Sequence, residues 1–450
     1  MSFRSSLAIL AGKSSRWFLH NFMHGGTSLP GKLTLKIDPN VLQTLAKDYE
    51  IIVITGTNGK TLTTALTVKV LESKFGHVLT NKSGSNMKQG IVTAFLSDKV
   101  SEKSGKKLAV LETDEANVPI ICRYVSPSIF VLTNLFRDQM DRYGEIYTTY
   151  DKILTGIRMH PDALVIANGD APIFNSKELK NKVVYYGFAD KEEEDQKAPA
   201  NTDGLLCPHC HHILHFKYRT YSNLGKYFCP ECGFKRPELT YSLNQISSQS
   251  PQSSVFEIDG AKVELHIGGT YNIYNALAAY SVGRALGLSG DESARALSDN
   301  DEKVFGRQEV INIDDNQTTL ILVKNPVGLD QVLEMISTDK EPFSLAVLLN
   351  ANYADGIDTS WIWDGNFEGL PFDRIPSVLT GGERYKDITF RLQVAGVPEK
   401  NFSQREKLED VVSFIKQMPT NHVYVLATYT AVLQLRKFLS EQGYIKGGMD

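Results

Sequence analysis

Short apolar runs rich in Val and Ile recur along the chain, and longer stretches with a helical spacing of apolar residues separate them. Such runs are typical of buried strands, and strands that alternate with helices build a parallel α/β sheet. In the first half of the chain the runs occupy residues 49–55, 107–113, 128–134, 163–168 and 183–188. A helical pattern follows the first run and ends at Gly76. The pattern predicts an α/β domain with a parallel sheet in this part of the chain.

The same alternation resumes later in the chain and predicts a second, smaller α/β unit. Apolar runs at residues 318–326, 343–350 and 423–430 are expected to form strands, with a helix at residues 329–337. This set suits a small Rossmann-like domain, in which ligands bind at the carboxyl ends of the strands. We place this C-terminal domain at residues 311–450.

The first part of the chain, residues 1–44, is predicted to be a helical segment. Its apolar core, LAILAG, is too short for a secretory signal, so we expect the segment to be retained. The spacing predicts an amphipathic helix with Arg4, Lys13 and Arg16 on its polar side. The apolar residues of this helix are Leu7, Leu10, Trp17, Phe18 and Phe22. Packing against the rest of the protein or a partner is favoured here over binding to a membrane surface.

Composition narrows the class of protein. Of 450 residues, 42% are hydrophobic and 22% are charged, which is typical of a globular protein and argues against global disorder. The formal net charge is −4, so the chain as a whole does not attract nucleic acid, and we expect no nucleic-acid partner. No apolar run approaches the roughly 18–20 residues of a membrane span.

Four of the five cysteines form a metal-site pattern. Cys207 and Cys210 make one C-x₂-C turn, and Cys229 and Cys232 make a second after eighteen residues, a spacing typical of zinc sites. Four thiolates that point at one position close a tetrahedron and predict a structural zinc site. Two disulfides are the alternative, which the absence of an export signal disfavours. A histidine at 209, 211 or 212 is a further alternative ligand, disfavoured because the set of four cysteines is complete.

Polar segments at residues 191–204 and 244–254 flank these cysteines. Both are rich in Ser, Pro, Gly or charged residues and are interpreted as linkers. The zinc ribbon is therefore predicted to be an insertion, residues 204–243, in a larger domain. The fifth cysteine, Cys122, lies in an apolar stretch and is expected to be a buried core thiol.

A phosphate-binding loop is predicted directly after the first strand. The sequence Gly-Thr-Asn-Gly-Lys-Thr at residues 56–61 separates this strand from a helix. Glycines let backbone N–H groups turn toward phosphate oxygens, and the helix N-terminus adds partial positive charge. Lys60 would bridge phosphates of ATP, and the Thr61 hydroxyl would bind Mg²⁺.

A second strand, residues 107–113, ends in three carboxylates, Glu112, Asp114 and Glu115. A carboxylate at the carboxyl end of a buried strand beside a phosphate loop is placed to hold Mg²⁺ directly or through water. Glu112 is nearest the end of the strand, but the pattern leaves the choice among the three open.

Five motifs in order resemble those of Mur ligases and folylpolyglutamate synthases, and the resemblance implies an ATP-binding domain of this type over residues 45–310. They are ITGTNGKT (54–61), Glu112, TNLFRDQMDRYG (133–144), GTYNIYNALAA (269–279) and GRQE (306–309). The resemblance implies a ligase that uses ATP to convert a carboxylate into an acyl phosphate, which an amine attacks. It also implies that Thr57, Asn58, Gly59, Lys60, Thr61, Asn275 and Arg307 bind ATP, and that Thr61 and Glu112 hold Mg²⁺. Asn134 has a weaker case, because Asn at a strand end is also a common turn residue.

Three departures from the family pattern are informative. Gln139 replaces a histidine that holds a second metal in the family, and no lysine matches the family's carbamylated lysine. Only about fifty residues precede the loop, too few for a domain that grips a UDP-linked substrate. A zinc ribbon is not a general feature of the family.

The chain has a further motif, D-G-x-D-x-S-W, at residues 355–361. With this motif and the three departures, the chain resembles an amidating branch of the Mur ligase family. That resemblance implies that Asp355 is catalytic and interacts with attacking ammonia; the alternative is an ordinary Asp-Gly turn. It further implies amidation of the α-carboxylate of D-glutamate in the stem peptide of lipid II, giving D-isoglutamine. The setting would be peptidoglycan synthesis in the cytoplasm, at the inner face of the membrane.

We expect this chain not to generate ammonia from glutamine by itself. A glutaminase needs a nucleophilic cysteine at a sharp turn, and no cysteine of this chain is placed in such a motif. The resemblance implies a heterodimer with a glutamine amidotransferase subunit (GatD-like) that supplies ammonia. Two other functions remain open on sequence alone: a stand-alone amino-acid ligase like folylpolyglutamate synthase, and a zinc-ribbon ATPase that binds nucleic acid.

Overall fold

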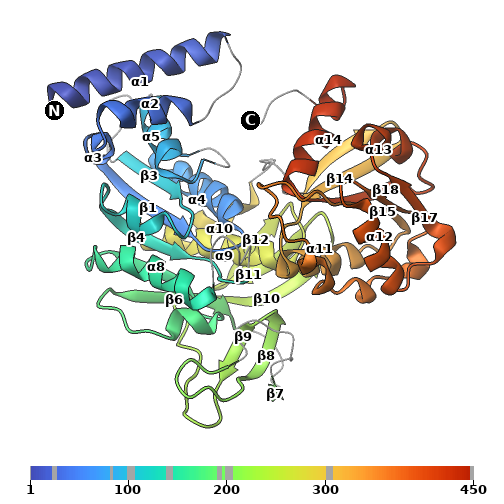
Figure 1. The fold of residues 1–450 in the computed structure, drawn as a ribbon. Coiled ribbons are helices and arrows are strands. Elements are labelled where there is room, and N and C mark those ends of the chain that lie inside the picture. Colours follow the sequence, from blue (N-terminus) through green and yellow to red (C-terminus); the bar gives the residue numbers. More distant parts are fainter. Residues whose placement is uncertain are drawn as a thin grey trace.

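A computed structural model describes residues 2–22, 28–81, 85–98, 107–137, 145–189, 195–197, 206–299 and 308–445 of the chain. A helical layer formed by the first residues covers one end of a large central sheet, a small ribbon lies at the opposite end, and a second α/β unit stands beside the sheet (Figure 1). These parts match the predicted combination of a Mur-ligase-like central domain and a C-terminal α/β domain.

The central sheet contains nine strands within the described residues, in the order β12-β11-β10-β6-β5-β4-β1-β3-β2. Strands β1 to β6 and β10 run parallel, and β11 is antiparallel to both of its neighbours, β10 and β12. The strands are β1 (Tyr49–Thr55), β2 (Val78–Thr80), β3 (Lys107–Glu112), β4 (Pro127–Leu132), β5 (Leu164–Asn168), β6 (Val183–Phe188), β10 (Tyr241–Gln249), β11 (Ser254–Ile258) and β12 (Ala261–Leu265). Because β1 lies between β3 and β4, its carboxyl end opens at the middle of the sheet, where ligands bind in open α/β folds.

Helices pack on this sheet and also form the N-terminal end of the molecule. They are α1 (Phe3–Phe22), α2 (Leu29–Ile37), α3 (Val41–Ala46), α4 (Lys60–Phe75), α5 (Lys88–Ser97), α6 (Val118–Ile121), α8 (Ile146–Arg158), α9 (Thr270–Ala285) and α10 (Gly290–Ser298), with a 3₁₀ turn η1 (Pro172–Asn175). In the part of the chain that is described, no helix combines the length and the apolar character needed to cross a bilayer.

The C-terminal sheet has six described strands in the order β13-β14-β18-β15-β16-β17, parallel except for β13 against β14. Its strands are β13 (Glu309–Ile313), β14 (Asn316–Leu322), β15 (Phe343–Leu348), β16 (Val378–Gly381), β17 (Phe402–Arg405) and β18 (His422–Ala427). Its helices are α11 (Pro326–Ser337), α12 (Tyr385–Val394), α13 (Leu408–Ile415) and α14 (Tyr429–Glu441), and its 3₁₀ turns are η2 (Ser360–Trp363), η3 (Phe367–Gly369), η4 (Phe372–Arg374) and η5 (Glu399–Asn401).

The ribbon contains β7 (Gln196–Lys197), β8 (His215–Tyr221) and β9 (Leu224–Phe228), and it carries the four cysteines of the two C-x₂-C motifs. The prediction of a linker over residues 244–254 is wrong, because these residues complete β10, turn, and begin β11. The reason is that β10 pairs with β6 only over Tyr241–Leu243 and then extends past it. Its polar side chains there meet solvent, so the segment lacks the apolar alternation of a half-buried strand.

A buried carboxylate attaches the ribbon to the central sheet. Asp170, fully buried after β5, accepts hydrogen bonds from Arg236 Nη1 (2.8 Å), Tyr274 OH (2.7 Å) and the backbone N–H of Phe188 (2.8 Å). Arg236 follows the ribbon cysteines and also donates to Tyr218 OH of β8 (2.7 Å). Burial raises the pKa of Asp170, and the charge of Arg236 acts in the opposite direction.

We expect Arg236→Met to destabilise the protein by about 3–5 kcal/mol, because it leaves Asp170 buried without a cationic partner. Chemical denaturation monitored by tryptophan fluorescence would measure this change. The double variant Asp170→Asn with Arg236→Met removes both charges and should recover much of the loss. Equal destabilisation by the single and double variants would show that the charge pair is not the cause.

Candidate active site

The loop after β1 has the backbone of a phosphate cradle. Gly56 and Gly59 have φ angles of 138° and 82°, which side-chain-bearing residues rarely adopt. Gly59 is the N-cap of α4, and Lys60 is the first residue of that helix. The predicted strand–loop–helix order is confirmed, and the loop amides lie at the positive end of the helix dipole.

Asn275 of α9 lies directly against this loop. A Cβ added to Gly59 would be 2.1 Å from Asn275 Oδ1, so the glycine is required by space as well as by its φ angle. The same oxygen accepts a hydrogen bond from Thr63 Oγ1 (3.2 Å), and Asn275 is only 4% exposed. The side chain is therefore next to the loop, where the resemblance expects it; its contact with a nucleotide stays a prediction.

Lys60 is buried and paired within the loop. Its Nζ donates to the carbonyl oxygens of Gly56 and Thr57 and forms an ion pair with Glu115 Oε2 at 3.2 Å. Burial raises the pKa of Glu115, and the positive charges of Lys60 and Lys324 act against that rise. Lys324 thus brings a cation from the C-terminal domain to this side of the loop. Neither Glu115 nor Lys324 was among the residues predicted to bind ATP.

Glu112, at the end of β3, faces the first turn of α4. Thr61 Oγ1 donates to Glu112 Oε1 at 3.2 Å, while Asn81 Oδ1 accepts from the Glu112 backbone N–H (2.9 Å). A hydroxyl and a carboxylate at this separation fit Mg²⁺, which prefers oxygen ligands and completes its shell with water and phosphate. Asp114 instead accepts from the backbone of Ala116 (3.1 Å), so the three acids have three different surroundings.

Asn134 and its neighbours support the loop from the end of β4. Asn134 Oδ1 accepts from the Asn58 backbone N–H (2.8 Å), and its Nδ2 donates to the Asn58 carbonyl (3.0 Å). Thr57 directs its hydroxyl to Phe136 rather than into the loop, accepting from the Phe136 N–H at 3.1 Å. These contacts indicate that Asn134 positions the loop. The predicted motif residues 138–141, including Gln139, and the predicted ligand Arg307 lie outside the described residues.

The C-terminal domain touches the loop through Asn325, which the sequence analysis did not single out. Asn58 Nδ2 donates to Asn325 Oδ1 (3.2 Å), and Asn325 Nδ2 donates to Asn58 Oδ1 (3.0 Å). The Asn325 oxygen also accepts from Gly328 N (2.8 Å), so this residue caps α11. An Asn-Pro pair before a helix is a cap signal in sequence, but it does not indicate the partner across the domains.

Asp355 lies beyond β15, at the same edge of the C-terminal sheet as Asn325. Its carboxylate accepts from the backbone N–H (2.7 Å) and hydroxyl (2.5 Å) of Thr430, in the first turn of α14, and from Asn352 N (3.0 Å). Asp355 N also donates to Asn352 O (2.8 Å), and Gly356 has a φ of 89°. Asp355 thus ends a turn that begins at Asn352, and its buried carboxylate also caps α14. Its catalytic role stays a prediction.

A cleft of about 920 Å³ separates the central domain and ribbon from the C-terminal domain. Arg137 on the central side pairs with Asp364 on the opposite side. The cleft adjoins the loop. Arg137 of the cleft directly follows Phe136, which contacts Thr57 of the loop. Pro326 of the cleft directly follows Asn325, which contacts Asn58 of the loop. Burial raises the pKa of Asp330, another lining residue, to about 6.

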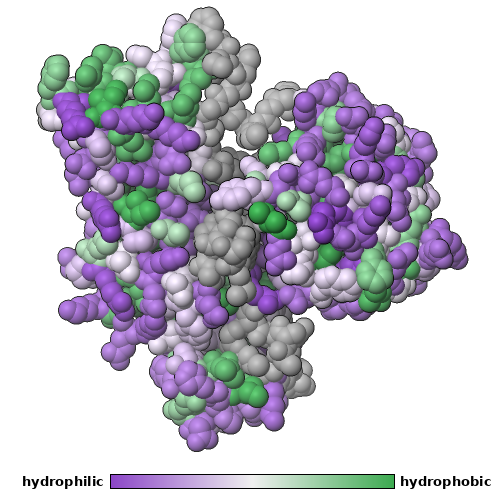
Figure 2. All heavy atoms as spheres, viewed as in Figure 1, coloured by the Kyte–Doolittle hydropathy of each residue, from purple (hydrophilic) through white to green (hydrophobic). Residues whose placement is uncertain are grey.

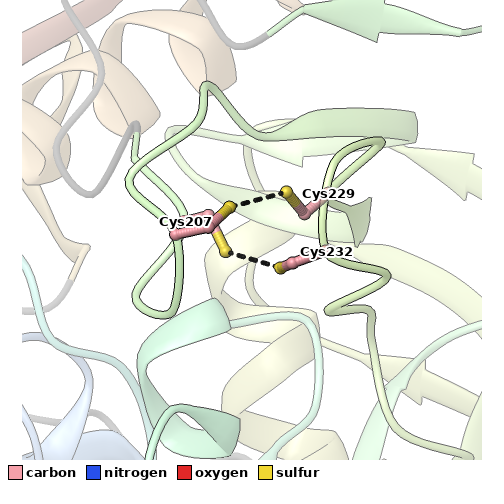
Figure 3. A group of neighbouring side chains, drawn as sticks. Cys207, Cys229 and Cys232 are labelled. Carbon is pink, nitrogen blue, oxygen red and sulfur yellow. Dashed lines mark hydrogen bonds between the residues drawn. The ribbon is translucent and has the colours of Figure 1, made fainter.

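The four ribbon cysteines converge as predicted. Their sulfur atoms lie within 4.8 Å of one another, with 3.5 Å between Cys207 and Cys232 and 3.4 Å between Cys210 and Cys229. Figure 3 shows three of these side chains turned toward a common centre. Tetrahedral zinc with Zn–S bonds of about 2.3 Å separates its sulfur ligands by about 3.8 Å, so the cluster fits a metal ion of this kind. Cys122 is buried as expected, and burial raises the pKa of its thiol to about 12.

Family models match both major parts of the chain. The Mur ligase middle domain matches residues 54–219, and the MurT ligase C-terminal domain matches residues 322–432. The lipid II isoglutaminyl synthase (glutamine-hydrolyzing) subunit MurT of Streptococcus pneumoniae (strain ATCC BAA-255 / R6) is 50% identical over 450 residues, which cover all of both chains. The chain belongs to the MurT family. A MurT subunit of Staphylococcus aureus (strain N315) is 35% identical over 87% of each chain.

Solved structures share the fold at low identity. A pseudomurein peptide ligase type C from Methanothermus fervidus has a TM-score of 0.67 and 19% identity, with 90% of this chain and 81% of that chain covered. MurF ligase from Thermotoga maritima, in complex with ADP, has a TM-score of 0.62 and 14% identity, with 91% and 85% covered. These structures show that the MurT-family chain has the fold of the Mur ligases.

We expect Gly59→Ala to abolish measurable ATP binding, because the added methyl group would collide with Asn275 and the φ of 82° disfavours alanine. Isothermal titration calorimetry with MgATP would measure the loss. Gly76→Ala is the matched control at the other end of α4: its φ is 75°, but no atom lies within 4 Å of the added Cβ. It should cost about 1 kcal/mol of stability and leave ATP binding intact. Normal ATP affinity in Gly59→Ala would contradict this account of the loop.

Proposed function

We propose that this chain is the synthetase subunit of a lipid II amidating enzyme. It would use ATP to activate the α-carboxylate of D-glutamate in the stem peptide, and ammonia from a glutaminase partner would give D-isoglutamine. The observation that carries the proposal is the 50% identity over the whole chain to a lipid II isoglutaminyl synthase subunit. The reaction would take place in the cytoplasm, at the inner face of the membrane.

The loop geometry supports the phosphoryl-transfer step. The loop amides and Lys60 would hold the phosphates of ATP, and Lys60 would leave its pairing with Glu115 when the more highly charged phosphates arrive. Thr61 and Glu112 are the residues that would hold Mg²⁺, which supplies positive charge to the phosphates when bound. Asn275, which lies against the loop, would contact the nucleotide from α9.

The amidation step would take place between the two domains. The γ-phosphoryl group passes to the glutamyl carboxylate, and ammonia then displaces phosphate from the acyl phosphate. Asp355 would accept a proton from, or orient, the attacking ammonia, and its place at the carboxyl end of the C-terminal sheet supports that role. The adjoining cleft, with arginines and carboxylates on its walls, offers space for a peptide substrate. Closure of the cleft would exclude water, which otherwise hydrolyses the acyl phosphate.

A separate subunit would generate the ammonia. The relatives are described as glutamine-hydrolyzing and as one subunit of their enzyme. In this chain the cysteine outside the ribbon, Cys122, is buried, and its raised pKa disfavours the thiolate that a glutaminase needs. A glutamine amidotransferase subunit (GatD-like) in a heterodimer is therefore the proposed source.

Co-purification with the native partner, followed by mass spectrometry of lipid II, would test this function. Wild type should replace one hydroxyl by an amino group only when both glutamine and ATP are present. Lys60→Ala should lower the rate by at least about 100-fold, because a positive charge is lost from the transferring phosphates. Lys74→Ala, which changes an exposed lysine of the same helix, should keep full activity. Amide formation without ATP turnover would refute the proposal.

Asp355→Asn tests the second step. This variant should bind ATP normally, keep a capping oxygen for α14, and lose most amidation. Thermal unfolding would separate loss of chemistry from loss of the cap. Amidation at the wild-type rate would remove Asp355 from the mechanism. Activity of the isolated chain with an amino acid as nucleophile would instead favour a stand-alone ligase, and salt-dependent binding of an oligonucleotide would favour the nucleic-acid alternative.

We propose further that the cysteine cluster binds one structural Zn²⁺. Four thiolates leave no open position for a substrate, so the ion would brace the ribbon, whose own buried core is small.

Elemental analysis of the purified protein should find about one zinc per chain. Cys207→Ser should lower the zinc content to near zero and make the ribbon sensitive to protease, since the ribbon loses its main cross-link. Cys122→Ser, which changes the buried cysteine outside the cluster, should keep the metal. Full zinc content in Cys207→Ser would contradict the proposed ligand set.

A further inference from the structure

Helix α1 is attached to the protein by its small residues. Ser5, Ala8 and Gly12, at helical spacing, are buried. A Cβ on Gly12 would lie 2.2 Å from Thr34 Oγ1 of α2 and 2.7 Å from Leu96 of α5, so the helices meet closely there. Ser5 Oγ also donates to Asp38 Oδ2 at 2.6 Å. The helix is therefore fixed in one orientation about its axis.

This orientation turns the large apolar side chains of α1 to the surface. Phe3, Leu7 and Leu10 are 87%, 50% and 65% exposed. Trp17 and Phe18 continue the same face with 64% and 51% exposure. At about 100° per residue these five positions fall within an arc of about 100°. Figure 2 shows the corresponding hydrophobic surface over α1 and α2, at the upper left of the molecule. The sequence analysis favoured packing of this helix on the rest of the protein or on a partner. The helix does pack on the protein, but through its small residues rather than through its large apolar ones.

The charge of this region is of one sign. Residues 2–37 contain Arg4, Lys13, Arg16, Lys32 and Lys36 and no Asp or Glu. The segment thus carries +5, and the other residues together carry −9, since the whole chain carries −4. Lys13, Lys32 and Lys36 are exposed, close to the apolar residues in α1 and α2.

We infer that the exposed face of α1, with the lysines of α1 and α2, docks on the surface of a membrane that contains anionic phospholipid. An apolar stripe with Trp and Phe, bordered by Lys and Arg, is the pattern of a helix that lies in the interface plane. Anionic headgroups complement the +5 segment, whereas most of the protein would be repelled by them. The inference rests on the proposed function, because a lipid-linked substrate is held in such a membrane.

A membrane surface accounts for both features better than a protein partner does. The face is a convex helix ridge with large side chains, and a bilayer can accept such a ridge without a matching groove. Cations on both helices match a uniformly negative surface, while a protein partner would need a carboxylate for each. Docking here would hold the enzyme next to its substrate and raise the local concentration of lipid II at the cleft.

Vesicle sedimentation of the full complex tests the inference. Vesicles of phosphatidylcholine mixed with phosphatidylglycerol, without lipid II, should bind the wild-type complex, and binding should weaken in pure phosphatidylcholine and at high salt. The triple variant Phe3→Ser, Leu7→Ser, Leu10→Ser should bind at least about tenfold less, because three exposed apolar side chains are lost. Lys13→Glu, Lys32→Glu, Lys36→Glu should cause a loss of similar size on the anionic vesicles only.

A matched control changes three exposed apolar residues elsewhere: Ile120→Ser, Met159→Ser and Val394→Ser. It should bind vesicles as wild type does. No binding of wild type to anionic vesicles, or equal loss in the control and the α1 variant, would overturn the inference. Loss of the glutaminase subunit from the α1 variant during purification, with vesicle binding unchanged, would assign the face to a protein partner instead.

An amidation assay separates this inference from the proposed function. The α1 triple variant should amidate a water-soluble, short-chain analogue of lipid II at the wild-type rate and vesicle-embedded lipid II at least about tenfold more slowly. Equal rates on the embedded substrate would refute docking while leaving the function intact. Absence of amidation by the wild type on both substrates would refute the function, and the vesicle-binding result would stand by itself.

Discussion

The space left by the absent side chain at Gly59 determines how the phosphate loop is held. The Asn275 amide occupies the position that a Cβ would take, and it also binds Thr63 in the first turns of α4. Through this contact α9 supports the start of α4, where Thr63 lies 212 residues earlier in the sequence than Asn275. Asn134 binds the backbone of the same loop at Asn58, so two neutral side chains contact the loop. A loop held in this way keeps its N–H groups oriented before any anion arrives, which limits the entropy that binding must overcome.

The ribbon depends on the sheet in a different way. Among the described residues, its own buried cluster has six members: Cys207, Leu214, Phe216, Tyr227, Cys229 and Phe234. Asp170 of the central domain needs a cation, and Arg236 at the end of the ribbon supplies it. The sheet edge and the ribbon therefore stabilise one another, which explains how an insertion with so little apolar area is held in one position against the domain.

Local signals explain what could be predicted from the sequence. The strand before the phosphate loop is apolar, the glycines indicate the turn, and the two C-x₂-C motifs indicate the ribbon. Each of these features depends on a few residues that are adjacent in sequence. Glu115 and Asn325 could not be chosen in this way, because their roles arise from Lys60 and Asn58, which are distant in sequence. The polar strand β10 was missed because solvent, rather than apolar side chains, borders its last residues.

The orientation of α1 illustrates the same limit. Spacing predicts an amphipathic helix, but only the close approach at Gly12 decides which face turns inward. Where two helices pack closely, the small residues face the neighbouring helix, since a large side chain at that point would push the helices apart.

The amide pair of Asn58 and Asn325 gives the junction between the domains an unusual property. Two amides that exchange hydrogen bonds carry no net charge, so their strength is insensitive to ionic strength, whereas the Arg137–Asp364 pair at the cleft wall is weakened by dissolved ions. The junction thus has a neutral contact beside the phosphate loop and an ionic contact at the cleft wall. Dissolved salt would therefore weaken the contact at the cleft wall and leave the amide contact beside the loop unchanged.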